Sequence, residues 1–185
     1  QRADGSLTTA PASEDLVIKG QANPKWTFGW NNTVSWKNWT LNLFFNAAAG
    51  VERLNISHYA TASMTGGTRF ITLRDSYYQG WDKVKDKAQA RYPSLTNTDN
   101  KNYANSDRWL EDASFIKLKN ISLSYNIPRR IAKFANIQLS VSAQDLFTIT
   151  GYKGMDPEVY NAYDGLDYGA YPIPRTVTFG AKFNF

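Results

Sequence analysis

The side chains that could carry chemistry are few and scattered. The 185-residue chain has one histidine, His58, and no cysteine, so it can form no thiolate metal site and no cluster of imidazoles. We expect His58 to be an ordinary surface residue. The sequence contains no Gly-rich phosphate loop, nucleophile elbow or HExxH motif. We therefore predict that the chain is not an enzyme and holds no metal or other cofactor.

Two carboxylates flank a proline in the sequence Asp156-Pro157-Glu158. Hard oxygen ligands of this kind suit calcium or the hydroxyl groups of a glycan. Aspartate also often accepts a hydrogen bond from the backbone two residues further on. Turn capping within a rigid loop is therefore the favoured alternative for this pair.

Aromatic side chains are the second group of candidate binding residues, and the chain has 11 Tyr, 6 Trp and 10 Phe. Outside the regular segments they could stack on sugar rings, contact a protein partner or pack within their own loops. With Asp156 and Glu158, our candidate contacts for cargo or partner are Tyr77, Tyr78, Trp81, Trp109, Tyr152, Tyr160, Tyr163 and Tyr171.

Five segments must position these residues, and each alternates large apolar with small or polar residues. This period of two predicts strands with one apolar face, over residues 25–37, 39–50, 113–126, 136–149 and 175–185. Asn32 interrupts the apolar positions of the first strand, and the parity changes near Asn120 in the third. We expect a β-bulge at each place.

The connections between these strands are alternately short and long. Short turns are predicted at 37–38 and 127–135, and long excursions at 51–112 and 150–174, with one short helix at about 81–91. Outer-membrane barrels typically have short periplasmic turns and long extracellular loops. We therefore predict an all-β, antiparallel transmembrane β-barrel, of which this chain supplies about the last five strands.

The predicted segments are an extracellular loop at 1–24, barrel hairpins at 25–50 and 113–149, extracellular loops at 51–112 and 150–174, and a C-terminal barrel strand at 175–185. No apolar run approaches the ~20 residues of a membrane helix. A mean hydropathy of -0.49 is compatible with a barrel, because only every second residue of a spanning strand must be apolar.

Five strands cannot close a barrel by themselves, since the smallest single-chain outer-membrane barrels have about eight. The sequence begins at Gln1 without a start Met or an export signal, so we expect a removed precursor segment or a piece of a longer chain. The net charge of +5 is dispersed except at Arg129, Arg130 and Lys133, which argues against a nucleic-acid partner.

Three groups of motifs resemble the C-terminal end of SusC/RagA-type TonB-dependent transporters, in the same order along the chain. They are residues 22–26 leading into 31–33, residues 106–125, and residues 143–148 followed by 152–158 and 171–176. The resemblance implies a barrel of about 22 strands with a plug, both largely missing here, in the outer membrane of a Gram-negative bacterium. It also implies a SusD-like surface lipoprotein, energy from the TonB complex, and oligosaccharide cargo, with peptide as the exception.

In this interpretation one face of the strands meets membrane lipid and the other faces the lumen. The expected lipid-facing set is Leu41, Leu43, Leu139, Val141, Val177, Phe179, Ala181 and Phe183, and the expected lumen-facing set is Asn42, Gln138, Ser140, Ser142, Lys182 and Asn184. Phe183 and Phe185 resemble the terminal signal presented to the outer-membrane insertion machinery, with the C-terminus in the periplasm.

A soluble, aromatic-rich β-sandwich that binds carbohydrate is the alternative function. It also predicts strands and exposed tyrosines, but a sandwich hides its apolar faces whereas a barrel exposes one to lipid.

Overall fold

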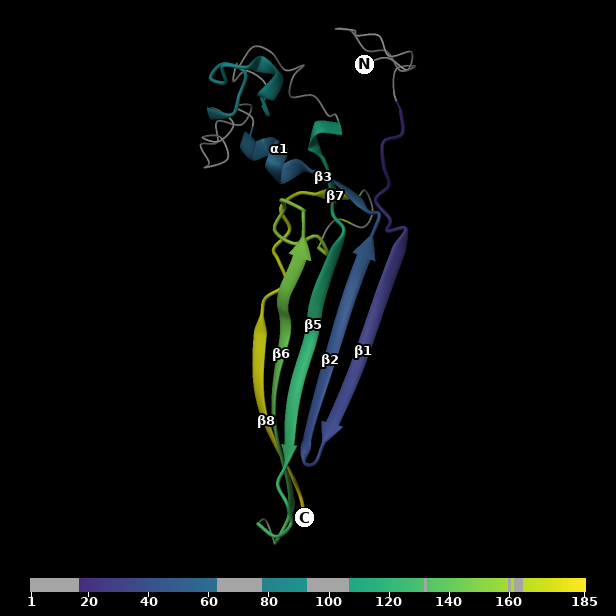
Figure 1. Ribbon diagram of the computed structural model, residues 1–185, viewed down its shortest axis with the longest axis vertical. Helices are drawn as coiled ribbons and strands as arrows, with labels where there is room; N and C mark the ends of the chain where they lie inside the picture. The colour runs from purple at the N-terminus through teal and green to yellow at the C-terminus, as the bar shows by residue number, and fades with distance from the viewer. Residues whose placement is uncertain (1–16, 63–77, 93–106, 132, 160, 162–164) are drawn as a thin grey trace.

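Five long strands form one antiparallel sheet (Figure 1). The computed structural model describes residues 17–62, 78–92, 107–131, 133–159, 161 and 165–185. The strands follow the order β1-β2-β5-β6-β8, and their bounds are Trp26–Trp36, Trp39–Ala49, Phe115–Asn126, Asn136–Thr150 and Thr176–Asn184. The five predicted strands are confirmed to within a residue or two at each end.

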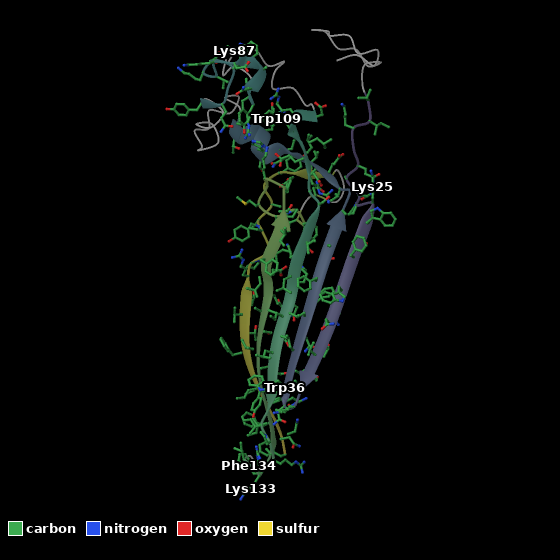
Figure 2. The ribbon with its side chains drawn as sticks, viewed as in Figure 1. Lys25, Trp36, Lys87, Trp109, Lys133 and Phe134 are labelled. Atoms are coloured by element: carbon green, nitrogen blue, oxygen red, sulfur yellow. The ribbon has the colours of Figure 1, made fainter. Side chains whose placement is uncertain are left out.

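The short turns and the long excursions lie at opposite ends of this sheet (Figure 1). The β1–β2 turn has only two residues, Lys37 and Asn38, between the paired Trp36 and Trp39, and Lys37 has a φ of 53°. Figure 2 shows Trp36 near this end, with Lys133 and Phe134 at the tip of the second short connection. We call this the turn end and the opposite end the loop end.

The register gives the sheet one apolar and one polar face. Paired residues in neighbouring strands share a face, so single rows can be followed across all five strands. One row is Val34, Leu41, Leu123, Val141 and Phe179. The adjacent row is Thr33, Asn42, Ser122, Ser142 and Thr178. The predicted division of the side chains into two sets is therefore confirmed.

A bulge preserves this division in β5. The pairing of β5 with both neighbours skips Lys119, between Leu118 and Asn120. The extra residue lets Ile116 and Leu118 share the apolar face with Ile121 despite their opposite parity. The bulge expected near Asn120 is confirmed. The one expected at Asn32 is wrong, because Asn32 pairs with Leu43 in unbroken register.

The apolar face is bare in the described residues. Phe28 and Trp30 are each 57% exposed and Phe179 is 81% exposed. A soluble sandwich would cover such a face with a second sheet, so the fold argues against that alternative. The described part of the chain contains no helix with the length and apolarity needed to cross a membrane.

A second, smaller layer lies at the loop end (Figure 1). Strands β3 (Glu52–Asn55), β4 (Leu110–Asp112) and β7 (Leu166–Asp167) form a sheet of order β4-β3-β7, and helix α1 (Ile56–Ala62) follows β3. The long connection predicted at 51–112 thus contains two short strands and a helix, α1, that the sequence did not predict. These strands have two to four residues, too few to show a clear alternation.

The helix expected over 81–91 is also wrong. The segment contains turns and only a short 3-10 helix, η2 (Lys87–Gln89), capped by Asp86, whose carboxylate accepts a hydrogen bond from Ala88 N at 3.1 Å. The backbone N–H of Trp81 donates instead to Tyr92 O, at 3.0 Å. An isolated helix of this length is marginal, and closure of the loop between Trp81 and Tyr92 replaces it.

Candidate functional site

The loop layer is joined to the long sheet by a small apolar core. Ala48 and Phe115 pair on the polar face at the loop end, and Val51, Ala113 and Tyr152 complete the cluster. All five residues are at most 8% exposed. This core lets residues from both long excursions pack against the ends of β2 and β5.

Two lysines of β5 tie the second excursion to the sheet. Lys117 Nζ donates to both carboxylate oxygens of Asp156, at 2.9 and 3.0 Å, and to Glu158 Oε2 at 2.8 Å. Lys119 Nζ donates to Glu158 Oε2 and to Asp145 Oδ1, each at 3.0 Å. We call these five residues the lysine–carboxylate cluster. The bulge at Lys119 places both lysines on the polar face.

The cluster is well shielded from water at its centre. The Lys117 side chain is 2% exposed and that of Asp156 is 7% exposed, against 24% for Glu158. Burial opposes ionisation of Glu158, but hydrogen bonds from Lys117 and Lys119 outweigh it and hold the Glu158 pKa below its ordinary 4.5. The carboxylate therefore stays ionised and paired at neutral pH.

Asp156 also caps a turn. Its carboxylate accepts hydrogen bonds from Glu158 N at 3.0 Å and from Ile173 N at 3.4 Å. This supports the turn-capping alternative, since the carboxylate oxygens are occupied by an ammonium group and backbone N–H groups. Within the described ranges, no group of three or more His, Asp or Glu residues has an arrangement suited to a metal ion.

Tyr152 and Asp167 close the second excursion on itself. The Tyr152 hydroxyl donates to Asp167 Oδ2 at 2.5 Å, and Asp167 also accepts from Gly169 N at 2.8 Å. Burial, followed by the hydrogen bond to Asp167, raises the Tyr152 pKa above its ordinary value. The phenol therefore remains a neutral donor and holds the segment after Thr150 against β7.

Glu111 joins the two excursions. Its carboxylate contacts His58 Nδ1 at 2.8 Å and accepts hydrogen bonds from Asn55 Nδ2 at 3.3 Å and Lys153 N at 3.0 Å. Burial disfavours the ionised form of Glu111 and acts to raise its pKa. The hydrogen bonds, of which the one with His58 contributes most, outweigh burial and lower the Glu111 pKa. Three segments distant in sequence are thus held by one carboxylate.

His58 is not the surface residue that we expected. Its side chain is 11% exposed, its Nε2 lies 3.2 Å from the Tyr92 hydroxyl, and its ring meets Trp109 edge-on at 5.5 Å. Tyr59 meets the same indole at 5.4 Å. The local sequence around His58 gave no indication of burial, because its partners come from residues 92–111.

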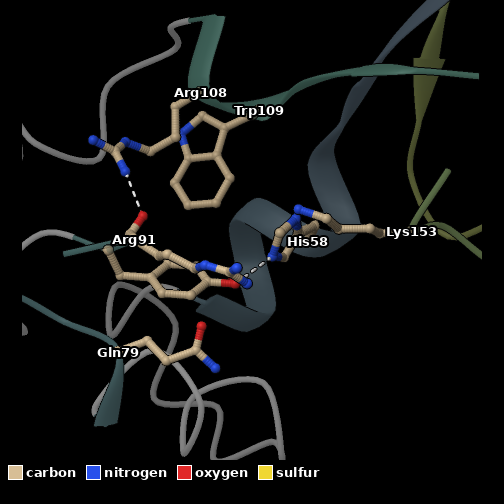
Figure 3. Close-up of a pocket in the computed structure, with 7 residues that line it drawn as sticks. His58, Gln79, Arg91, Arg108, Trp109 and Lys153 are labelled. Carbon is tan, nitrogen blue, oxygen red and sulfur yellow. Dashed lines mark hydrogen bonds between the residues drawn. The ribbon is translucent and has the colours of Figure 1, made fainter. Parts of the chain in front are cut away.

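A pocket of about 420 Å³ lies beside this aromatic group (Figure 3). Its lining residues come from α1, the segment 79–92, the 3-10 helix η3 (Asp107–Trp109) and the chain after β6. They are His58, Gln79, Arg91, Tyr92, Arg108, Trp109 and Lys153. We call this the arginine pocket.

The predicted contact residues divide into exposed and buried sets. Tyr78, Trp81 and Tyr171 are 64%, 51% and 86% exposed and can meet a ligand or a partner. Trp109 and Tyr152 are buried within the loop layer, where they pack rather than project, and Asp156 and Glu158 belong to the lysine–carboxylate cluster. Tyr77, Tyr160 and Tyr163 lie outside the described residues.

Five residues that organise this layer were missed from the sequence. They are Glu111, Lys117, Lys119, Asp145 and Asp167. Lys117 did offer a signal, because a charge at a polar-face position of an apolar strand needs a partner. The others depend on contacts between residues far apart in the chain.

Comparisons with known proteins agree on one group. The chain is 35% identical to TonB-dependent receptor P3 of Formosa agariphila, over 98% of this chain and 18% of the relative. It is 35% identical to TonB-dependent receptor SusC of Bacteroides thetaiotaomicron, over 40% of this chain and 7% of that protein. No protein-family model matches the chain.

Solved structures agree with this fold. The RagAB peptide importer in its closed-closed state matches all of this chain and 20% of that one, at 24% identity and a TM-score of 0.78. Its open-open state gives a TM-score of 0.74 at 23% identity. The chain spans about a fifth of the length of these relatives.

Fold and sequence together define the class: the chain forms part of an antiparallel transmembrane β-barrel of the kind found in TonB-dependent receptors. It belongs with the SusC/RagA-type TonB-dependent receptors, and the resemblance of its motifs to that group is confirmed.

The lysine–carboxylate cluster predicts unequal effects of its two lysines in the full-length receptor. Lys117→Met leaves the buried Asp156 without its cation, a type of change that costs about 3–5 kcal/mol. Because this can be relieved by release of the loop, we expect faster hydrogen exchange in residues 151–159 while the barrel stays folded. Lys119→Met is the matched control, since its more exposed lysine leaves Glu158 paired with Lys117. Equal exchange in the two variants would contradict this role for Lys117.

The same cluster predicts a dependence on pH. The folded pKa of Glu158 lies below 4.5, so its stabilising effect is fully present above about 4.5 and is lost as the pH falls through its folded value. Protection of residues 151–159, corrected for intrinsic exchange rates, should therefore decrease below pH 4.5. Glu158→Gln should remove most of this decrease. Protection that increases on acidification would reverse the predicted sign.

Proposed function

We propose that this chain forms part of the wall and mouth of a TonB-dependent transporter that imports oligosaccharides or peptides with a SusD-like surface lipoprotein. The single observation that carries the proposal is likeness to a TonB-dependent receptor over 98% of the chain, in a sheet with one bare apolar face. The other partners in this proposal are the remaining barrel and plug, the TonB complex, membrane lipid and the insertion machinery.

The proposed orientation places the loop end outside the cell. Two short turns lie at the opposite end of the sheet, with the C-terminus (Figure 1), and barrels of this class keep short turns in the periplasm. The apolar face then meets lipid, while the polar face and the lysine–carboxylate cluster face the lumen. Buried charges on the lumen side are consistent with this arrangement.

Contacts with cargo or with the lipoprotein are proposed for the exposed aromatic residues of the loop layer. Tyr78, Trp81 and Tyr171 stand out from a frame fixed by Glu111 and the lysine–carboxylate cluster. Aromatic side chains held on a rigid frame lose little conformational entropy when they bind. RagAB is named a peptide importer, and the motif resemblance favours oligosaccharide, so both cargo classes belong in the test.

Uptake by the full-length receptor, expressed with its lipoprotein in Gram-negative cells that carry a TonB complex, tests the proposal. Cells with and without the receptor would be given labelled oligosaccharide and oligopeptide mixtures, and depletion of the medium would be measured with TonB present or deleted. We expect receptor-dependent and TonB-dependent depletion of one mixture. If the receptor altered neither mixture in either background, the transport proposal would be wrong.

The proposed orientation predicts a difference between two adjacent positions in β6. Val141 lies on the apolar face near the middle of the strand and Ser142 on the polar face. Arginine at a lipid-facing midplane position costs about 2–4 kcal/mol, whereas a lumen position solvates it. Val141→Arg should therefore lower the free energy of unfolding in lipid vesicles much more than Ser142→Arg. Similar losses would invalidate the assignment of faces.

Phe183 and Phe185 are proposed to serve recognition by the insertion machinery, supported by their exposure at the turn end, where they are 52% and 96% exposed. Phe185→Ala should lower the amount of inserted receptor far more than the stability of the inserted fraction, since one aromatic contributes only ~1–3 kcal/mol. Surface labelling and urea midpoints measure the two quantities. Trp36→Ala removes another aromatic at the same end as a control. Normal insertion with a lowered midpoint would leave only an anchoring role.

A further inference from the structure

The arginine pocket concentrates positive charge at the loop end. Arg91, Arg108 and Lys153 line it from three different segments (Figure 3), and all three residues are exposed. The Arg108 guanidinium donates to Arg91 O at 2.8 Å, which keeps the two arginine segments adjacent. Two arginines and one lysine therefore line the same pocket.

Within the described residues, no carboxylate is ion-paired with any of these three cations. The described ion pairs of the loop layer involve Lys19, His58, Lys117 and Lys119 instead. Glu111, which contacts His58 Nδ1, is also engaged by Asn55 and the Lys153 backbone. An anion bound among these cationic side chains would be attracted by each of them.

The pocket walls are fixed and offer further polar groups. His58 is held between Glu111 and the Tyr92 hydroxyl, and the rings of His58 and Trp109 pack edge-on. Gln79 contributes an amide on the opposite side (Figure 3). Guanidinium groups bind carboxylates and sulfates through two parallel hydrogen bonds, and a fixed wall lowers the entropy that is lost on binding.

The size and shape of the pocket favour a small group over a flat protein surface. A concave volume of about 420 Å³ lies within the ~300–1,000 Å³ of small-molecule sites. We propose that the arginine pocket binds an oxyanion, a carboxylate or a sulfate ester, carried by one residue of the imported cargo. This rests on the proposed function and deepens it, because it assigns the cargo an acidic group that this pocket recognises.

Binding to the purified full-length receptor–lipoprotein complex in detergent tests the inference without requiring transport. The probes are glucuronate and glucose, which differ by one carboxylate, and inorganic sulfate. We expect glucuronate to bind with measurable affinity by calorimetry, glucose to bind at least tenfold more weakly, and sulfate to compete with glucuronate. Loss of a charge-assisted contact in Arg91→Gln or Lys153→Gln should weaken glucuronate binding by about tenfold or more.

Lys85→Gln is the matched control, because it removes the same charge from an exposed residue of the same segment outside the pocket. Equal effects of Lys85→Gln and Arg91→Gln, or equal binding of glucose and glucuronate, would overturn the proposal. Direct binding of sulfate without any binding of glucuronate would reduce the pocket to a site for free inorganic anions and also overturn it. These outcomes are independent of uptake, so failure of transport and failure of the pocket are distinguished.

Discussion

The whole structure depends on keeping most large apolar side chains of the long strands on one side of a sheet that is five strands wide. Hydrocarbon offers no partner to a backbone N–H or C=O, so the strands must pair throughout, and their side chains must divide strictly between two environments. The unbroken rows across all five strands show that the register meets this constraint. The extra residue at Lys119 is part of the solution, because without it the two halves of β5 would present their apolar residues to opposite faces.

The same bulge that keeps the two faces of the sheet distinct also helps to hold the loop layer in place. It leaves Lys117 and Lys119 on the polar face, and the carboxylates that satisfy them come from Asp145 and from the segment after β6. Glu111 and Tyr152 then join that segment to β3, β4 and β7. Polar interactions thus organise the loop end, while apolar periodicity organises the strands.

This division explains how much could be predicted from the sequence. The strands, the two-residue turn at Lys37 and the bulge near Asn120 follow from a local period of two. Strands β3, β4 and β7 were missed because they are too short to display that period, and their pairing joins residues more than fifty positions apart. The candidate site was predicted only in part for the same reason: exposed aromatics could be named from composition, whereas the burial of His58 and the partners of Lys117 depend on distant segments. The helix expected over 81–91 does not form. Its amphipathic pattern is short, and the backbone hydrogen bond from Trp81 N to Tyr92 O closes a loop there instead.

The separation of the loop frame from its outward side chains has a consequence for how such a receptor can diversify. Glu111, Asp167 and the lysine–carboxylate cluster form bonds inside the layer, whereas Tyr78, Trp81 and Tyr171 project from it. Substitutions among the projecting residues leave those internal bonds intact, so the outer surface of this layer can change while the scaffold is retained. Related chains can therefore differ in the chemistry of this surface by single substitutions, without a new fold or a compensating change in the long strands.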